Sequence, residues 1–394
     1  TPETLDGGTA YGRPAPTYRK ELTEVGPGTP MGELLRRYWH PIGLAADATD
    51  TPRQVRVLGE DLILFRDKAG RPGLVVPDCA HRGTSLYYGK VEERGIRCCY
   101  HGWLFDVQGR CLEQPCEPEA GARHRDKVRQ PWYPIQELYG LVWAYLGPPD
   151  RKPVLPRYEC LEVLDEGEML EANDHSIGGG GPAIIPCNWL QHYENLVDPF
   201  HVVVLHSTFS GTQFVEQMAL MPDVRWDTVE LGVQTTSIRK LADGRTFRRI
   251  SQAAMPTLRV IPSPRVGTYG RVESIGWVLP IDDHHFRIYV VGRVRHAGDL
   301  VRMRSRPDGK RLWEELDEAD HQRYPGDYEA MVSQGPIASH SREHLASSDR
   351  GIVMLRRYLQ QQLEVMQQGG DPAGVSFDPA APPVVFAAGN YLED

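Results

Sequence analysis

Hydrophobic residues between positions 28 and 150 come mostly in short runs rather than at helical spacing. The exception is the segment 31–39, MGELLRRYW, which follows Thr29-Pro30 and predicts one short helix. From Trp39 onward, apolar and β-branched residues alternate or run together over five to seven positions, with turn residues between the runs. Such runs are typical of strands; they read VRVLG, DLILFRD, GLVVPD and ELYGLVWAYLG. The first part of the chain is therefore expected to be a small all-β unit over residues 40–150.

The second part of the chain has a mixed pattern. The segment 187–206, CNWLQHYENLVDPFHVVVLH, predicts a helix, and strand-like stretches dominate residues 222–296. Polar turns at Asp243-Gly244 and Asp282-Asp283 divide these stretches, as expected of an antiparallel sheet. Near the end, apolar residues spaced by three and four predict an amphipathic helix; they are Ile352, Leu355, Leu359, Leu363 and Met366. The whole chain is expected to be α+β.

Composition shifts suggest where these parts begin and end. Residues 1–27 are rich in Gly, Pro and Thr and are expected to form an irregular surface arm. The stretch 147–158, GPPDRKPVLPRY, is dense in proline and marks a boundary. We therefore expect an arm over 1–27, the β unit over 28–150 and the mixed unit over 151–394.

Charge and cysteine content limit the partners and the compartment. The 394 residues carry a net charge of −9, which argues against a nucleic-acid partner. The sequence has no run of eighteen apolar residues, so no membrane span is expected, and the first residues do not have the pattern of a signal peptide. Seven cysteines over this length do not form the pattern of a disulfide framework. We expect a protein of the reducing cytoplasm.

The stretch 79–101, CAHRGTSLYYGKVEERGIRCCYH, carries the most specific chemistry. It holds a Cys-x-His pair, Cys79 and His81, and a Cys-x-x-His pair, Cys98 and His101. A Rieske [2Fe–2S] centre needs two thiolates on one iron and two imidazoles on the other. Glycines at 83 and 102 follow the pairs and would let backbone amides approach the sulfurs. The pattern predicts a Rieske cluster.

A structural zinc site is the alternative for the same residues, since Cys2His2 ligation also binds zinc. Zinc modules usually pair like with like, whereas each pair here has one cysteine and one histidine. Cys99 lies beside Cys98, but only Cys98 has the x-x spacing to His101. Cys99 is therefore expected to be a buried packing thiol.

The predicted helix over 187–206 holds a second group of possible ligands. Glu194, Asp198 and His201 are four and three residues apart and share one helix face. His206 lies five residues beyond His201, so both can reach one metal only if the helix ends or widens as a π-type bulge does. Simple packing is the alternative for any single buried helix histidine.

Together these motifs resemble those of the Rieske non-heme iron ring-hydroxylating oxygenases, large subunit. YHGW at 100–103 and the pattern Glu194-Asn195-x-x-Asp198-x-x-His201-x4-His206 carry the resemblance. It is closest to the phthalate dioxygenase-like group, which includes ring dioxygenases and aryl O-demethylases, through VDPFHVVVLH and SQGPIASHSREHLASSDRGIVMLRR. The resemblance implies an all-β Rieske domain followed by a catalytic domain of helix-grip, START-like architecture.

The resemblance also implies roles for single residues. His201 and His206 would bind a mononuclear Fe(II), together with a carboxylate from a later helix, for which Asp349 is the matching position. Asp349 follows Ser347-Ser348, where a carboxylate is also a good helix cap. Asp198 would join His201 to a cluster histidine, His101, of a neighbouring subunit, with modulatory roles for Glu194 and Asn195.

The implied activity is hydroxylation of an aromatic substrate by a terminal oxygenase. Electrons from NADH or NADPH would come through a separate reductase of flavin and iron–sulfur type, and O2 would be the oxidant. A homotrimer, or a multiple of it, is implied. Phthalate-type dioxygenation of an aromatic carboxylate is the first expectation, and O-demethylation or monooxygenation of a methoxylated or ether-linked acid the second. A Rieske electron carrier and a zinc-stabilised binding protein are remoter alternatives.

An anionic substrate inside an acidic protein needs a local cation. The sheet region offers six, any of which could equally be a surface charge: Arg239, Lys240, Arg248, Arg249, Arg259 and Arg265. The sequence does not distinguish among them.

Overall fold

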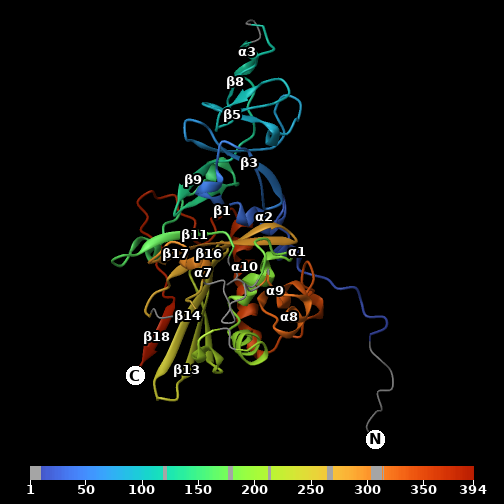
Figure 1. Ribbon diagram of the computed structural model, residues 1–394. Helices are drawn as coiled ribbons and strands as arrows, with labels where there is room; N and C mark the ends of the chain where they lie inside the picture. Colours follow the sequence, from blue (N-terminus) through green and yellow to red (C-terminus); the bar gives the residue numbers. More distant parts are fainter. Residues whose placement is uncertain are drawn as a thin grey trace.

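Small antiparallel sheets stack on a large one along the molecule (Figure 1). The computed structural model describes residues 10–118, 122–175, 181–211, 214–263, 269–302, 313 and 315–394. At one end lies a four-stranded sheet of β5 (Lys90–Glu92), β6 (Gly95–Arg97), β7 (Leu104–Phe105) and β8 (Cys111–Glu113), with α3 (Ala122–Arg125) at its tip. Two three-stranded sheets follow: β2 (Arg53–Val57), β3 (Glu60–Arg66) and β4 (Pro72–Val75), then β1 (Trp39–Leu44), β10 (Leu141–Tyr145) and β9 (Ile135–Leu138). The all-β prediction for this part is confirmed.

The large sheet has the strand order β11-β17-β16-β15-β14-β13-β12, and β18 pairs with β14. All of its pairings are antiparallel. Its strands are β11 (Met169–Asn173), β12 (Asp223–Val229), β13 (Gly232–Lys240), β14 (Thr246–Ala254), β15 (Leu258–Val260), β16 (Ser274–Asp282), β17 (His285–Val294) and β18 (Gly389–Glu393). The turns predicted at Asp243-Gly244 and Asp282-Asp283 lie between β13 and β14 and between β16 and β17.

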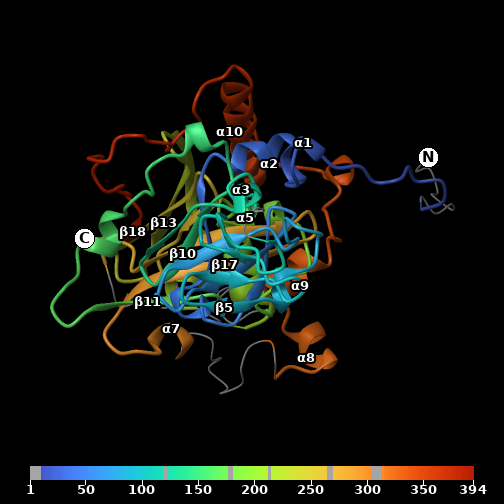
Figure 2. The ribbon, with the colours of Figure 1, turned by 90° about the horizontal axis from the view of Figure 1, so that it is seen from above.

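Helices flank this sheet, as the α+β prediction required. The long helix α10 (Arg350–Gln367) lies with α1 (Lys20–Thr23) and α2 (Pro30–Leu35) along one side, and α7 (Asp299–Arg302) and α8 (Glu318–Arg323) lie on the opposite side (Figure 2). Leu355, Leu359 and Leu363 are buried, as the spacing predicted. The remaining α-helices described are α4 (Glu159–Glu162), α5 (Trp189–Asn195), α6 (Phe200–Val203) and α9 (Asp327–Val332).

Strand β3 connects two hydrophobic cores. Side chains alternate between the faces of a strand, so Leu62 and Leu64 join the large core while Ile63 and Phe65 join a smaller one around Cys79. The large core extends from the first helices through β1 and β10 into the large sheet. The small end unit is thereby held firmly on the body of the protein.

The N-terminal arm is shorter than predicted. Leu22 and Val25 are fully buried, and the segment around them forms α1. These two apolar residues join the large core, which outweighs the turn-forming character of their neighbours.

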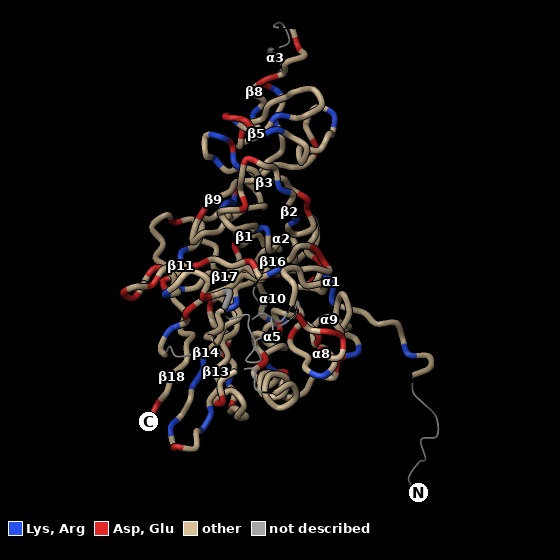
Figure 3. Tube along the Cα trace, viewed as in Figure 1, with Lys and Arg blue, Asp and Glu red and all other residues tan. Residues whose placement is uncertain are grey.

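Charged residues of both signs are interspersed along the trace (Figure 3). Many of the arginines form ion pairs with nearby acids, for example Arg66 with Glu137 and Arg157 with Glu162. Among the described residues, no helix has both the length and the apolar character needed to cross a membrane.

Candidate metal centres

Two loops at the end of the molecule hold the predicted cluster residues. Cys79 and His81 lie on the loop after β4, and Cys98 and His101 on the loop between β6 and β7. The backbones repeat one pattern: Cys79 N–H donates to the Thr84 carbonyl over 3.0 Å, and Cys98 N–H to the corresponding carbonyl of residue 103 over 2.9 Å.

A glycine closes each loop. Gly83 N–H donates to the Cys79 carbonyl over 2.8 Å and Gly102 N–H to the Cys98 carbonyl over 3.1 Å. Their φ angles of +76° and +72° lie in the left-handed region, which favours glycine. The Cys79 sulfur accepts hydrogen bonds from the backbone N–H groups of the two residues 81 and 82. Backbone amides therefore do approach this sulfur, as predicted.

In these loops the two cysteine side chains lie together, and so do the two histidine rings. Burial, together with the neighbouring Cys98 thiol, raises the pKa of Cys79 to about 11, although the two backbone amides oppose this. The His81 and His101 rings lie 4.6 Å apart between centroids, and His81 stacks on Trp103 at 4.3 Å. Burial, with the charge of His101, lowers the pKa of His81 and favours the neutral imidazole that binds metal.

The spacing of these donors favours two metal ions over one. The four donors of a single zinc ion would lie within about 4.6 Å of one another, twice the metal–ligand bond length. Among the described residues, only His201, His206 and Asp327 form a group of three donors within 4.8 Å, so no three of the cluster donors are that close. The two loops therefore fit a [2Fe–2S] cluster better than zinc.

Two side chains that the sequence did not single out support these loops. Gln130 accepts from Ala80 N–H over 2.8 Å and donates to the carbonyls of residues 76 and 78 over 2.8 and 2.9 Å. Arg97 donates to the Gly102 carbonyl over 2.6 Å. Cys99 is exposed, so its prediction as a buried thiol is wrong: its side chain leaves the core that holds Cys98.

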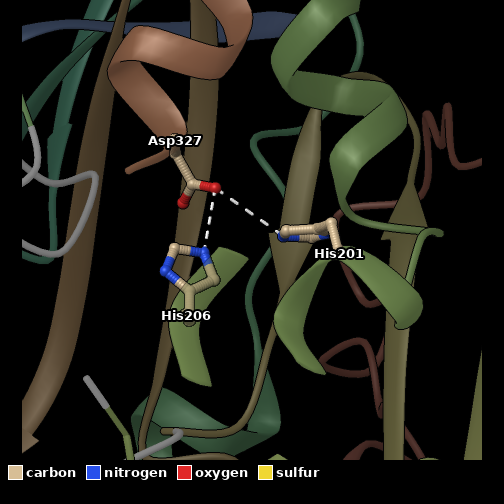
Figure 4. Close-up of side chains that lie close together, drawn as sticks. All are labelled: His201, His206 and Asp327. Carbon is tan, nitrogen blue, oxygen red and sulfur yellow. Dashed lines mark hydrogen bonds and ion pairs between the residues drawn. The ribbon is translucent and has the colours of Figure 1, made fainter. Parts of the chain in front are cut away.

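The second group of ligands lies beside the large sheet (Figure 4). His201 comes from α6, His206 from the π-helical segment η5 (Val204–Phe209), and Asp327 opens α9. Asp327 Oδ1 lies 3.1 Å from His206 Nε2 and 3.6 Å from His201 Nε2. The predicted π-type widening is confirmed, and it turns His206 toward the same point as His201.

Asp198 lies on the other side of the His201 ring. Its Oδ1 accepts from the backbone N–H groups of Phe200 and His201 over 2.9 and 3.3 Å, and its Oδ2 lies 3.5 Å from His201 Nδ1. Burial would raise the pKa of Asp198, but the nearby His201 side chain and the two backbone N–H groups lower it below its usual value. A carboxylate in this position orients a ligating imidazole and fixes its tautomer.

Asp327 is held in its ionised form. Burial alone would raise its pKa, but the charge and hydrogen bond of His206, with the charges of His201 and His192, hold it well below the usual range. Two imidazoles and one carboxylate on one side of a point are the donor set of a mononuclear non-heme iron. The residues present therefore fit that metal.

The structure does not bring Asp349 to these histidines, so the predicted third ligand is corrected to Asp327. Asp349 Oδ2 instead accepts from Ala346 N–H over 2.7 Å, just before α10. Asp349 therefore caps the turn that precedes this helix, which is the alternative role that the sequence suggested. The sequence signal for Asp327 was an acidic residue after Pro325-Gly326 at the start of a helix.

Glu194 and Asn195 surround the helix end but do not reach the metal group. Arg356 occupies both carboxylate oxygens of Glu194, at 2.6 and 2.9 Å. The Asn195 carbonyl accepts from Asp198 N–H over 3.2 Å. Their contacts stabilise the segment that carries Asp198.

Comparison with known proteins agrees with this geometry. Residues 38–134 match the family described as the Rieske [2Fe-2S] domain. The chain is 51% identical to phenoxybenzoate dioxygenase subunit alpha of Ectopseudomonas oleovorans, over 98% of this chain and 94% of that protein. It is 35% identical to the 5,5'-dehydrodivanillate O-demethylase oxygenase subunit of Sphingobium sp., over 91% and 83%.

A solved structure shares the fold. NdmA of Pseudomonas putida CBB5 superposes with a TM-score of 0.61 at 18% identity, covering 90% of this chain and 99% of that one. Its likeness extends over both the cluster end and the large sheet. The cofactors are thus a Rieske [2Fe–2S] cluster and a mononuclear iron, and the chain belongs to the Rieske non-heme iron oxygenases.

Proposed function

We propose that this chain is the terminal oxygenase component that hydroxylates an aromatic carboxylate, with ring dioxygenation as the reaction. The group of His201, His206 and Asp327, with Asp198 against His201, is the observation that carries the proposal. The 51% identity to a phenoxybenzoate dioxygenase subunit supports an aryl-ether carboxylate as substrate. Electrons would come from an NAD(P)H-dependent reductase.

The proposed roles follow from the positions of the side chains. His201 Nε2, His206 Nε2 and Asp327 would hold iron from one side, and the iron would supply the activation of O2. The opposite side is left for substrate. Asp198 keeps the His201 ring oriented through Nδ1, and the ionised Asp327 balances part of the metal's charge. Cys79 and Cys98 would bind one iron of the cluster, and His81 and His101 the other.

We also propose a head-to-tail trimer in which His101 of one copy meets Asp198 of the next. The loops around the cluster carry exposed aromatic side chains, which suit a contact surface; they are Tyr87, Tyr88 and Tyr100. In one chain, these loops and the metal group of α6 and α9 are separated by the two three-stranded sheets (Figure 1). A contact between copies would bring the two centres together.

O-demethylation is the second candidate. The 35% identity to an O-demethylase oxygenase subunit favours it, and the same metal group could serve it. The two reactions differ in the substrate carbon presented to the metal, which the ligands themselves do not decide.

Product analysis under ¹⁸O2 separates these reactions. The purified oxygenase with a surrogate reductase and NADH would be given phenoxybenzoates and methoxylated aromatic acids. A product with two ¹⁸O atoms on one ring establishes dioxygenation, whereas formaldehyde with a new phenol establishes O-demethylation. If no aromatic acid is oxidised while the cluster absorbs normally, the proposed substrate class is wrong.

The variant Asp198→Asn tests whether this carboxylate connects the cluster to the mononuclear iron. Loss of substrate-dependent turnover with an unchanged cluster spectrum is expected, because an amide cannot balance a protonated or donating imidazole as a carboxylate does. Undiminished turnover would argue against the proposed path between the centres. A pure electron carrier would be unaffected by replacing His206.

A further inference from the structure

Three of the arginines of the large sheet share one of its faces. Residues opposite each other in antiparallel strands point to the same face. Arg249 of β14 lies opposite Ser237, two residues from Arg239 on β13, and Arg259 of β15 lies opposite Ala253. The alternation of side chains therefore puts Arg239, Arg249 and Arg259 on one face.

This face is the one that the metal-bearing helices cover. Trp226, opposite Thr235 on that face, donates from Nε1 to the Val197 carbonyl over 2.8 Å. Phe286, on the same face of β17, stacks against His192 of α5 with centroids 5.4 Å apart. The arginines and the ligands of the metal group thus border the same interior space.

Arg239 and Arg249 are buried without a carboxylate partner among the described residues. Arg239 is 1% exposed, donates from Nε to the Leu220 carbonyl over 2.9 Å, and has no hydrogen-bond partner at its buried Nη1. Arg249 is 8% exposed and donates to the carbonyls of residues 262 and 263 and to Asn390 Oδ1.

Their electrostatic surroundings are unfavourable to a positive charge. Burial lowers the pKa of Arg239 to about 10; burial and then the charge of Arg239 lower that of Arg249 to about 9, while Glu273 opposes this. Both stay protonated at neutral pH. Two adjacent buried cations are costly unless an anion joins them.

The other arginine and lysine candidates have other roles. Arg248 pairs with Glu393 and lies over the Tyr391 ring at the sheet surface, and Lys240 donates to the Thr246 hydroxyl. Arg265 lies outside the described residues. Burial lowers the pKa of Arg259, and the charge of Asp327 opposes this.

We propose that Arg239 and Arg249 bind the carboxylate of the substrate, with Arg239 Nη1 donating directly and Arg249 adding its charge. The proposal rests on the proposed aromatic oxygenase function and adds the residues that hold the acid group of its substrate.

The test compares Arg239→Gln with Arg248→Gln in the reconstituted holoenzyme. Arg248 is the matched control, since it is the neighbour of Arg249 on β14 but points to the other face. The probes are a phenoxybenzoate and its neutral carboxamide, each measured by calorimetric binding and by turnover.

The expected result is selective loss of acid binding. Removing one charged hydrogen bond should raise Kd and KM of the phenoxybenzoate about 10- to 100-fold in Arg239→Gln. Its kcat should change far less, and the carboxamide should bind as it does to the unchanged protein. Arg248→Gln should behave like the unchanged protein with both probes.

Other outcomes would reject the proposal. Equal effects of Arg239→Gln on acid and carboxamide, or no effect on either, would remove the carboxylate role. If Arg239→Gln does not fold, Arg239→Lys keeps the charge and should retain acid selectivity at a weaker Kd; lost selectivity there would count against it. Failure of the unchanged protein to oxidise any acid, with selective binding loss still present, would reject the proposed reaction but not the anion site.

Discussion

Each ring nitrogen of His201 faces a different carboxylate. Nε2 lies 3.6 Å from Asp327 and Nδ1 lies 3.5 Å from Asp198. Because an imidazole that binds metal through one nitrogen carries its proton on the other, the two acids have different tasks. Asp327 belongs to the metal side, and Asp198 to the outer side that could meet another subunit.

The pair Asp327 and Asp349 gives the sharpest test at the scale of single residues. Asp327→Ala should abolish binding of the mononuclear iron and turnover while the cluster absorbance stays, because two imidazoles alone hold iron weakly. Asp349→Ala should keep the iron and lower the free energy of unfolding by about 1 kcal/mol, the value of a lost helix cap. Metal analysis and thermal unfolding measure both effects. Iron loss from Asp349→Ala, with Asp327→Ala fully loaded, would restore the original assignment.

The sequence could identify most of the two centres because their ligands are close together in the chain. The pairs Cys79–His81 and Cys98–His101 lie on short loops, and His201 and His206 lie on one helical segment. Asp327 is distant in sequence and arrives through the packing of α9, which no local pattern specifies. Asp349 matched the expected helix start equally well, so spacing alone could not decide between them.

At the scale of elements, Arg356 ties the helix before the metal site to α10. Its guanidinium donates to both oxygens of Glu194 on α5 and to both of Glu343, at 2.6 to 2.9 Å. Burial would lower its pKa, but the two carboxylates raise it, so it stays charged. Glu194 lies four residues before Asp198, and the network therefore supports the position of that carboxylate.

Arg356→Met should consequently destabilise the protein by about 3 kcal/mol, because it leaves the largely buried Glu194 without its main counter-charge. The matched control is Arg357→Met, whose side chain is exposed on the same helix and should change stability by less than about 0.5 kcal/mol. Thermal unfolding of the holoenzymes, followed by the cluster absorbance, measures the difference. Equal midpoints for the two variants would show that the network adds no stability.

Elements were predictable where pattern and packing agree. The strands of the large sheet and α10 follow from apolar spacing, because their buried faces are continuous. The helix predicted over 187–206 is in fact divided into α5, α6 and the π segment, with Pro199 between the first two. The division at residue 150 into two domains stays a prediction, since one core crosses from β1 and β10 into the large sheet.

At the scale of the whole molecule, the two centres of one chain lie apart, with the two three-stranded sheets between them (Figure 1). The cluster loops lie beyond β3 and β4, and the metal group lies between the large sheet and α9 (Figure 1). If the copies associate head to tail, each working site is made from His101 of one copy and Asp198 of its neighbour. A chain without a cluster and a chain without mononuclear iron should then complement each other.

Co-expression of differently tagged Cys79→Ala and Asp327→Ala chains tests this arrangement. Each variant alone should be inactive, one for lack of the cluster and the other for lack of the iron. In every ring of three that holds both chains, one contact of the three joins an intact cluster to an intact metal group, so doubly tagged assemblies should recover up to about a third of the unchanged activity. The Asp198→Asn change has its effect only on the chain that holds the iron, because the bridge starts from His201 of that chain. Placing it on the Cys79→Ala chain should therefore abolish the recovered turnover, whereas placing it on the Asp327→Ala chain should not. Doubly tagged assemblies without any activity would mean that the two centres cooperate within one chain.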